Sequence, residues 1–457
     1  MKSDPKMLRS MNPATGEVVG EVPITPVDRI PQIVHDARKA QVGWAALSLE
    51  ERAKILIEAG KHLEADAKRI GGILTSEMGK PLAEGIGEAT YAATSISDEV
   101  EEIIPAITSE ILEDEHTITS MRFDPFGVVA AITPWNFPIL MPHQAVIPGL
   151  MAGNTVILKP SEETPLVAHE YVAALNKALP PGVLQIIHGD EQQGKALVES
   201  PVDLVVFTGS REAGKHILAE ASNGLKRVIL ELGGKDPLVI LKGADIEAAA
   251  SFAARNSFRN SGQVCVSTER LYVEGAIADE FTTALVGKAA ELKQGPGTED
   301  GVNIGPMINS TQKSHVVRQM EDAVRDGARV LFGGGESEGN YCPITVLDQV
   351  NHDMAIMTEE TFGPVACVMR VSGETEAVKM ANDTRFGLAA AVFGEETHAQ
   401  EVASKLTAGM IGVNRGCGGA KGSPWVGAQE SGYGWHSGPT GHRQFCQVRT
   451  LSRTKDC

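Results

Sequence analysis

Val128-Val129-Ala130-Ala131-Ile132 is an uninterrupted apolar run that begins directly after Gly127 and ends before a proline-rich string at 134–138. Further short apolar runs follow it along the chain, separated by stretches with helical spacing. The runs lie at 156–158, 183–187, 204–207 and 228–230, and the helical stretches at 165–178, 191–199 and 211–222. Strands that are apolar throughout and separated by helices indicate a parallel sheet that is covered on both faces.

A second alternation of strands and helices starts at Leu238. We expect strands at 238–241 and 270–273 and near 329, 366 and 390, with helices at 245–259, 278–292 and 311–326. Two successive layers of this kind predict an α/β fold with two doubly wound, Rossmann-like domains. The length of 457 residues agrees with this prediction, because so long a chain divides into two or three domains.

Three segments outside these layers have other patterns. Residues 26–105 have helical spacing, with charged residues on the opposite face. Residues 109–123 alternate like paired strands and end at Asp124-Pro125, and residues 443–453 again have the pattern of a strand. We interpret 109–123 as a projecting hairpin, and we expect it to form a small intersubunit sheet with 443–453.

Composition and charge argue against several classes of protein. The formal net charge of −18 argues against nucleic acid or an anionic membrane surface as a partner. A content of 42% apolar and 22% charged residues is typical of a soluble globular protein, and prolines interrupt the most hydrophobic stretch before it reaches the length of a membrane span. The first six residues lack the apolar core of a signal peptide. The six cysteines are sparse and form no CxxC pair, which argues against a disulfide framework or a metal site and favours a cytoplasmic protein.

Cys265 lies among small and polar residues in Asn-Ser-Gly-Gln-Val-Cys-Val, residues 260–266. Val264 and Val266 suit a buried cysteine that merely fills space. Gly262 and its polar neighbours instead favour a loop at the end of helix 245–259, where a thiol is accessible as a nucleophile. From this string alone, the two interpretations are about equal.

Two other polar side chains have the chemistry that such a nucleophile requires. Asn136 lies in Pro-Trp-Asn-Phe-Pro, residues 134–138, where the rigid prolines can hold its amide as an oxyanion donor; an ordinary turn residue is the alternative. Glu231 opens Glu-Leu-Gly-Gly-Lys at a strand end, 34 residues before Cys265. It is either paired with Lys235 or a base that activates water, given room by Gly233 and its neighbouring glycine.

Two loops have the features of a dinucleotide site. Gly209-Ser210-Arg211-Glu212-Ala213-Gly214 follows strand 204–207 and opens a helix, although Ser210 breaks the strict Rossmann fingerprint. Amides at a helix N-terminus can receive a pyrophosphate, and the Ser210 hydroxyl adds a donor. Lys159-Pro160-Ser161-Glu162 follows strand 154–158, at the sheet edge where an adenosine ribose would lie.

These strings together resemble the NAD(P)-dependent aldehyde dehydrogenase family, and the resemblance extends from Asn12-Pro13-Ala14-Thr15-Gly16 to Ser431-Gly432-Tyr433-Gly434. The resemblance implies that Cys265 captures an aldehyde, that Asn136 and the Cys265 backbone N–H hold the oxyanion, and that Glu231 activates the hydrolytic water. By the same resemblance, the cofactor is bound by the following residues: Trp135, Lys159, Glu162, Gly209, Ser210, Gly233, Glu360 and Phe362. Glu162 would accept hydrogen bonds from the ribose hydroxyls and repel a 2′-phosphate, which predicts NAD, with NADP as the alternative.

The resemblance also implies a domain arrangement. Residues 1–108 and 124–231 would form the NAD-binding domain and 232–425 the catalytic domain. Residues 109–123 and 426–457 would form a bridging element in a homodimer or homotetramer.

Two departures from the family leave the substrate open. Many members have a lysine nine residues after the oxyanion asparagine, where this chain has Ala145. Several strings resemble succinate-semialdehyde dehydrogenases, which typically hold the substrate carboxylate with two arginines. Arg259 matches one arginine, and Gln144 replaces the other, so a bidentate grip is lost. In the unusual loop after Asn414, Arg415 or Lys421 could replace the missing positive charge; alternatively, both are solvated loop cations. This loop leads to Trp425, where the family usually has Phe.

Several activities therefore remain open from the sequence. A semialdehyde, an aromatic aldehyde or a general aliphatic aldehyde would all suit the catalytic set. Transfer of the acyl group to CoA, reduction of an activated acid and a non-catalytic binding role are further alternatives. The presence of Cys265, Glu231 and Asn136 together disfavours these three.

Overall fold

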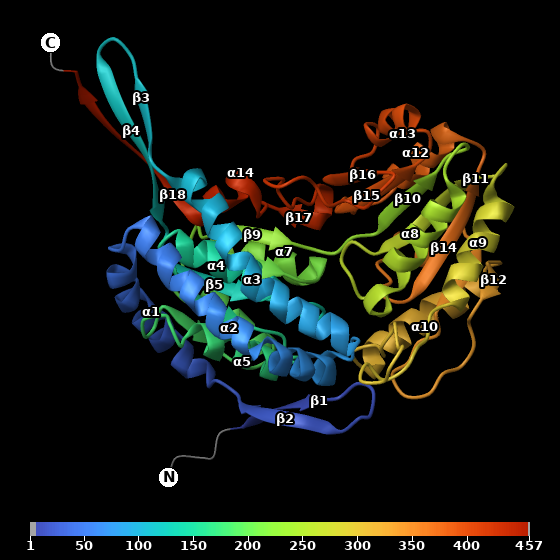
Figure 1. Cartoon of the computed structure of the whole chain (residues 1–457), viewed down its shortest axis with the longest axis horizontal. Helices are drawn as coiled ribbons and strands as arrows, with labels where there is room; N and C mark the ends of the chain where they lie inside the picture. The colour runs from blue at the N-terminus through green and yellow to red at the C-terminus, as the bar shows by residue number, and fades with distance from the viewer. Residues whose placement is uncertain (1–5, 456–457) are drawn as a thin grey trace.

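Long helices and a short ribbon form the N-terminal part of the computed structural model, which describes residues 6–455 (Figure 1). Residues 1–5 and 456–457, which include part of the N-terminal segment and Cys457, lie outside this range. The elements are β1 (Met7–Met11), β2 (Val18–Pro23), α1 (Ile30–Ala45), α2 (Leu49–Met78) and α3 (Leu82–Ile107). Helix α2 starts at a capping box made by Ser48 and Glu51 and ends at Gly79, whose φ of +90° is left-handed. The helical pattern predicted for 26–105 is confirmed.

The first apolar runs form a six-stranded sheet with the order β17-β9-β8-β5-β6-β7. Its strands are β5 (Val128–Ile132), β6 (Thr155–Lys159), β7 (Leu184–Ile186), β8 (Leu204–Thr208), β9 (Arg227–Glu231) and the short β17 (Gly432–Tyr433). All pairs are parallel except β17–β9. The intervening helices are α4 (Leu140–Met151), α5 (Pro165–Leu175), α6 (Glu191–Glu199) and α7 (Arg211–Ser222). The predicted buried parallel sheet is therefore confirmed, although α5 ends at Leu175 rather than at 178.

The second half forms a seven-stranded sheet with the order β12-β13-β14-β11-β10-β15-β16. Its strands are β10 (Asp236–Ile240), β11 (Thr268–Glu274), β12 (Arg329–Phe332), β13 (Thr345–Asp348), β14 (Val365–Val371), β15 (Ala389–Phe393) and β16 (Met410–Val413). The helices are α8 (Ile246–Phe258), α9 (Ala278–Ala290), α10 (Ser310–Arg325), α11 (Ala355–Thr358), α12 (Glu374–Asn382) and α13 (Glu396–Ala403). Only β12 runs antiparallel to its neighbour. Two doubly wound layers are confirmed, and β13 is a strand that the sequence pattern did not predict.

A three-stranded sheet projects from the body of the molecule (Figure 1). It contains β3 (Glu110–Glu113), β4 (Thr117–Pro125) and β18 (Cys446–Thr454), in the antiparallel order β18-β4-β3. The predicted pairing of the hairpin with the C-terminal segment is confirmed. Strand β18 begins at Cys446 rather than at 443, because Arg443–Phe445 forms a 3₁₀ turn after α14 (Gly438–His442). Residues 426–457 also supply β17 to the six-stranded sheet, so this segment contributes to two sheets.

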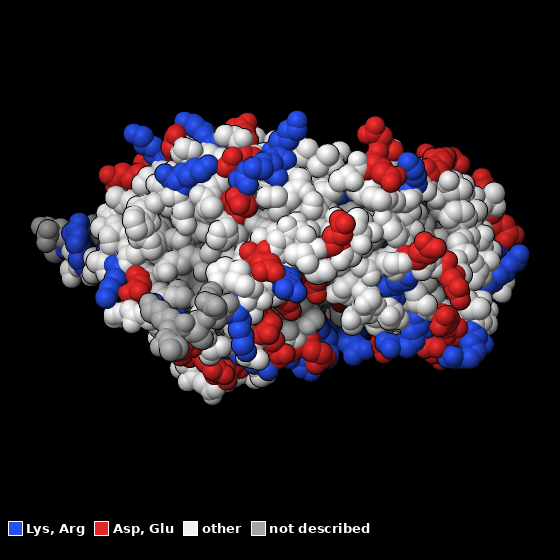
Figure 2. All heavy atoms as spheres, turned by 90° about the horizontal axis from the view of Figure 1, so that it is seen from below, with Lys and Arg blue, Asp and Glu red and all other residues white. Residues whose placement is uncertain are grey.

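The charged side chains on the surface and the hydrophobicity of the helices can be compared with the composition. Acidic and basic side chains are interspersed over the face in Figure 2, without an extended basic patch. No helix within residues 6–455 is both long and apolar enough to cross a membrane.

Candidate functional site

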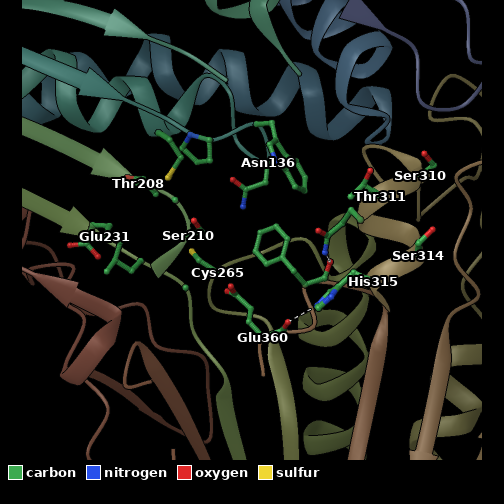
Figure 3. Close-up of a pocket in the computed structure, with 18 of the residues that line it drawn as sticks. Asn136, Thr208, Ser210, Glu231, Cys265, Ser310, Thr311, Ser314, His315 and Glu360 are labelled. Carbon is green, nitrogen blue, oxygen red and sulfur yellow. Dashed lines mark hydrogen bonds between the residues drawn. The ribbon is translucent and has the colours of Figure 1, made fainter. Parts of the chain in front are cut away.

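Two adjoining cavities lie where the carboxyl ends of the six-stranded sheet face loops and a helix of the seven-stranded sheet. Their volumes are about 730 Å³ and about 630 Å³, and Pro134, Trp135, Thr208, Gly209 and Ser210 line both. Most of the predicted site residues line the larger cavity (Figure 3), namely Trp135, Asn136, Gly209, Ser210, Glu231, Gly233, Cys265, Glu360 and Phe362. Lys159 and Glu162 line the smaller cavity. Residues from both sheets are therefore brought to one continuous groove.

Cys265 is half-buried in a loop whose backbone is tightly constrained. Asn260 and Ser261 have φ values of 52° and 57°, a left-handed conformation that is costly for residues other than glycine. Side-chain contacts hold this conformation, because the Ser261 hydroxyl donates to the carbonyl of Gly305 at 2.6 Å. The thiol lines the cavity while it also packs beside Leu388. Cys265 thus fills space and remains accessible at the same time.

The surroundings of Cys265 hold its thiol protonated in the absence of other charges. Burial raises the pKa of the Cys265 thiol above its ordinary value of 9.0, and the carboxyl groups of Asp236, Glu231 and Glu360 raise it further. A thiol in this environment needs a nearby positive charge or a base before it can act as a nucleophile.

The Asn136 side chain is buried and held in one orientation. Its Nδ2 donates to the carbonyl oxygen of Gln263 at 3.0 Å, and since that oxygen only accepts, the position of the amide nitrogen is defined. The Gln263 side chain is fixed in turn, because its Oε1 accepts from the Ile308 backbone N–H at 2.9 Å. Nδ2 retains a second hydrogen for a group in the cavity.

Glu231 is the last residue of β9, and its buried carboxyl group has no hydrogen-bond partner at either oxygen among the described residues. Burial raises the pKa of Glu231 well above its usual range, against a smaller opposing effect of the Trp425 side chain. One interpretation of the sequence paired Glu231 with Lys235, and this is wrong. The Lys235 ammonium donates to Glu269 at 2.5 Å instead. In Figure 3 the Glu231 carboxyl group points away from the Cys265 sulfur, so it must turn to act there.

The buried pair of Lys235 and Glu269 supports the loop that follows α11. The two Glu269 carboxylate oxygens accept from the backbone N–H groups of Thr361 and Phe362, both at 2.8 Å. The Phe362 ring meets the Trp135 ring edge-on, with centroids 5.5 Å apart. This places two aromatic rings from different sheets on the wall of one cavity.

Glu360 and Gly233 contact each other at the floor of the larger cavity. The Glu360 carboxyl group accepts from the Gly234 backbone N–H at 3.1 Å, and burial raises the pKa of Glu360 to about 8. A Cβ atom on Gly233 would lie 2.4 Å from both Glu360 carboxyl oxygens. Only glycine therefore fits at position 233 without displacing Glu360.

The shared wall and the smaller cavity suit a dinucleotide cofactor. The Ser210 hydroxyl caps α7 by accepting from the Ala213 backbone N–H at 3.4 Å, so the N-terminus of this helix faces the groove. In the smaller cavity the Lys159 ammonium lies 3.3 Å from the Glu162 carboxylate. The N-terminus of α7 offers donors for a phosphate group between the two cavities. In the smaller cavity, the Glu162 carboxylate offers an acceptor for ribose hydroxyls, and the Lys159 ammonium offers a donor.

The four predicted substrate residues do not line either of these cavities. The Arg259 side chain is half exposed, lies 3.5 Å from Glu84, and packs over the Phe137 ring at 5.6 Å. Arg415 donates to the carbonyl of Gly418 at 2.6 Å within its own loop. Gln144 is partly buried on α4.

Trp425 lies beside Cys265, but on a different cavity. It packs in the same apolar cluster as Cys265 and lines a third cavity of about 390 Å³, together with Cys417. Its ring stacks on His436 with centroids 6.2 Å apart.

Sequence reasoning missed one face of α10, which closes the larger cavity. The lining residues from this helix are Ser310, Thr311, Gln312, Ser314, His315 and Arg318. His315 Nε2 lies 3.1 Å from the backbone oxygen of Glu360, and Figure 3 shows Ser310, Thr311, Ser314 and His315 across the cavity from Ser210. Thr208 and Leu232, which flank the glycine-rich strings, were missed as well. A polar helix face has no sequence signal that separates a cavity wall from a solvated surface.

The chain is similar to known proteins over nearly its whole length. Residues 1–451 match the family described as "Aldehyde dehydrogenase family". The chain is 36% identical over 451 residues to glutarate-semialdehyde dehydrogenase of Pseudomonas putida, covering 97% of this chain and 94% of that protein. It is 36% identical to a probable NADP-linked succinate-semialdehyde dehydrogenase of Sinorhizobium fredii, covering 96% and 91%. A crystal structure of an aldehyde dehydrogenase from Brucella melitensis biovar abortus is similar with a TM-score of 0.95 and 38% identity, covering 99% of this chain and 95% of that one.

Proposed function

This chain belongs to the aldehyde dehydrogenase family, and on that basis we propose that it oxidises an aldehyde to a carboxylic acid through a thioester on Cys265. The observation that carries the proposal is the convergence of Cys265, Asn136 and Glu231 on one cavity, with both Glu231 carboxyl oxygens unpartnered. A structural carboxylate would have its oxygens satisfied by neighbouring donors. A carboxyl group that binds and deprotonates a water molecule instead needs oxygens that no neighbouring donor occupies.

In the first half-reaction the Cys265 thiol loses its proton to solvent, and the resulting thiolate sulfur bonds to the aldehyde carbon. The carbonyl oxygen becomes an oxyanion, which the Asn136 Nδ2 and the Cys265 backbone N–H stabilise. When bound, the nicotinamide cofactor supplies the acceptor for the hydride that leaves this carbon. The carbon then remains attached to Cys265 as a thioester.

In the second half-reaction Glu231 takes a proton from a water molecule. The water oxygen bonds to the thioester carbon and the carbon–sulfur bond breaks, which releases the acid and the Cys265 thiolate. The raised pKa of Glu231 makes its carboxylate a stronger base for this proton than an ordinary glutamate.

Two substitutions test the proposal. Cys265→Ala should abolish cofactor reduction, and retained turnover would end the assignment. Glu231→Gln should accumulate acyl-enzyme, and an unchanged steady-state rate would remove Glu231 from this role. Formation of acyl-CoA, with cofactor reduction that depends on added CoA, would favour the CoA-acylating alternative.

We also propose NAD as the preferred cofactor. Glu162 is on the wall of the smaller cavity, where its carboxylate would accept from both ribose hydroxyls and repel a 2′-phosphate. Glu162→Ser should raise kcat/KM for NADP relative to NAD. The idea fails if the wild type prefers NADP, as the name of the Sinorhizobium relative would imply for that protein.

For the substrate we propose an aliphatic semialdehyde held through Arg259 alone. Two of the named relatives are glutarate- and succinate-semialdehyde dehydrogenases by name, and Arg259 would receive a carboxylate after leaving Glu84 and turning toward the cavity that Cys265 lines. A single arginine binds a carboxylate less tightly than a pair, so the KM should be high. A neutral aldehyde is the second candidate, because position 144 is a glutamine and Arg415 is engaged within its own loop. A panel of succinate semialdehyde, benzaldehyde and medium-chain aldehydes, assayed with wild type and Arg259→Met, separates the two.

We further propose that the six-stranded sheet with its helices binds the cofactor and that the projecting sheet joins subunits. Exposed apolar side chains at Ile111, Leu112 and Leu451 occupy that sheet, and β3 and β18 are both edge strands. Sedimentation should give a dimer or a tetramer. A monomeric protein would argue against this role.

A further inference from the structure

Lys80 and Glu88 form a fully buried ion pair between the end of α2 and the first turns of α3. The ammonium Nζ lies 2.7 Å from the carboxylate Oε2, and the two side chains are 1% and 4% exposed. Removing two charges from water is expensive, and their attraction offsets the cost only when further hydrogen bonds are made. The partners of those further bonds therefore show which part of the molecule the pair serves.

Both charges make their remaining contacts with the string that carries the oxyanion amide. Lys80 Nζ donates to the backbone carbonyl of Asn136 at 2.9 Å and lies 4.0 Å from the centre of the Phe137 ring. The free oxygen of Glu88, Oε1, accepts from the backbone N–H groups of Ile139 and Leu140 at 3.0 Å and 3.1 Å. The pair thus holds residues 136–140 on both sides, at the start of α4.

We propose that Lys80 and Glu88 are positioning residues for the oxyanion donor, which rests on the function proposed for Asn136. The Asn136 side chain is fixed by Gln263, and its backbone carbonyl is fixed by Lys80 at 2.9 Å, with Asn260 Nδ2 as a longer second donor at 3.3 Å. Loss of the backbone restraint lets the amide move while its chemistry is unchanged. A displacement of about 1 Å at such a donor costs about 100-fold in rate, and loss of the donor costs about 100- to 1,000-fold.

The variant that tests this removes both charges together. Lys80→Met alone would leave Glu88 as an unpaired buried charge, which threatens folding. The double variant Lys80→Met/Glu88→Gln keeps the volume and leaves no charge. The double variant Arg370→Met/Asp348→Asn removes an ion pair with a buried carboxylate from the far sheet in the same way, and it is the matched control for a loss of stability alone.

A comparison in two backgrounds distinguishes positioning from general support. In the wild-type background, the double variant should lower kcat 10- to 100-fold with the KM for the cofactor changed less than threefold. In an Asn136→Ala background, the same change should lower kcat less than threefold, because the donor it positions is gone. The inference would be overturned by equal reductions of kcat in both backgrounds, or by an equal reduction from Arg370→Met/Asp348→Asn.

Hydrolysis of p-nitrophenyl acetate without cofactor gives a second readout, since attack of Cys265 on an ester carbonyl creates the same oxyanion. The double variant should slow this reaction by a similar factor only when Asn136 is present. If the wild type is active and the double variant slows the reaction equally with and without Asn136, the positioning role fails while the proposed function stands. If the wild type neither oxidises aldehydes nor cleaves the ester, both fail.

Discussion

Alkylation of Cys265 in the cofactor-free protein should be slow at neutral pH and should accelerate over the whole range from pH 7 to pH 9. Burial and the surrounding carboxyl groups hold the pKa of this thiol above 9.0. At pH 7 fewer than about 1 in 100 of the thiols is then ionised, and each pH unit multiplies the thiolate by about 10. The second-order rate constant with iodoacetamide should therefore rise about 100-fold from pH 7 to pH 9, without a plateau.

Peptide mass spectrometry measures this rate at Cys265 itself. Cys417 is the competing thiol, because it is half-buried in the same apolar cluster and its pKa is raised to about 11. Cys417→Ser should leave the Cys265 profile unchanged, which excludes transfer of label between them. Bound NAD would bring the positive charge of its nicotinamide ring into the cavity that Cys265 lines, so saturating NAD should accelerate alkylation at pH 7 at least tenfold. A plateau below pH 8 in the cofactor-free protein would refute this reasoning, because it would mean that the protein itself stabilises the thiolate.

Three further outcomes follow from the geometry of the site. Gly262→Ala should destabilise the protein by about 2–4 kcal/mol in urea unfolding, because the new Cβ would lie 1.9 Å from the Gly363 carbonyl oxygen at a φ of +70°; a loss below 0.5 kcal/mol would show that the loop yields freely. Gly233→Ala should weaken cofactor binding at least tenfold in fluorescence titration by displacing Glu360, and an unchanged Kd would remove Glu360 from the cofactor site. The raised pKa of Glu231 means that its basic form increases as pH rises through that value, so single-turnover thioester hydrolysis should speed up with pH in the wild type and stay flat in Glu231→Gln. A wild-type rate independent of pH would contradict this assignment.

The fold was predictable because its sheets are buried on both faces. A strand such as β5 has all five residues buried, so its apolar run and the helix that follows leave a clear period in the sequence. The short β13 has no such signal, because its four residues begin with Thr345 and end with Asp348 and leave only two apolar residues between them. The start of β18 was displaced for a similar reason, since residues 443–445 form a 3₁₀ turn that joins it to α14.

The site was predictable where glycine and proline restrict the backbone, as around Asn136, Gly233 and Cys265. The wall formed by α10 was not, because its polar face has the same composition as a solvated helix. Lys80 and Glu88 were missed for another reason: their importance depends on contacts with residues more than fifty positions away. Tertiary contacts of this kind leave no local pattern.

The most direct test of the two-step acyl mechanism is the intact mass of Glu231→Gln after reaction with excess NAD and an aldehyde that the wild type oxidises. We predict one acyl group per chain, mapped to Cys265, and a burst of one NADH per chain followed by a slow steady state. The mass should return to that of the free protein when hydroxylamine cleaves the thioester. Full turnover without an adduct, or an adduct on another residue, would contradict the account.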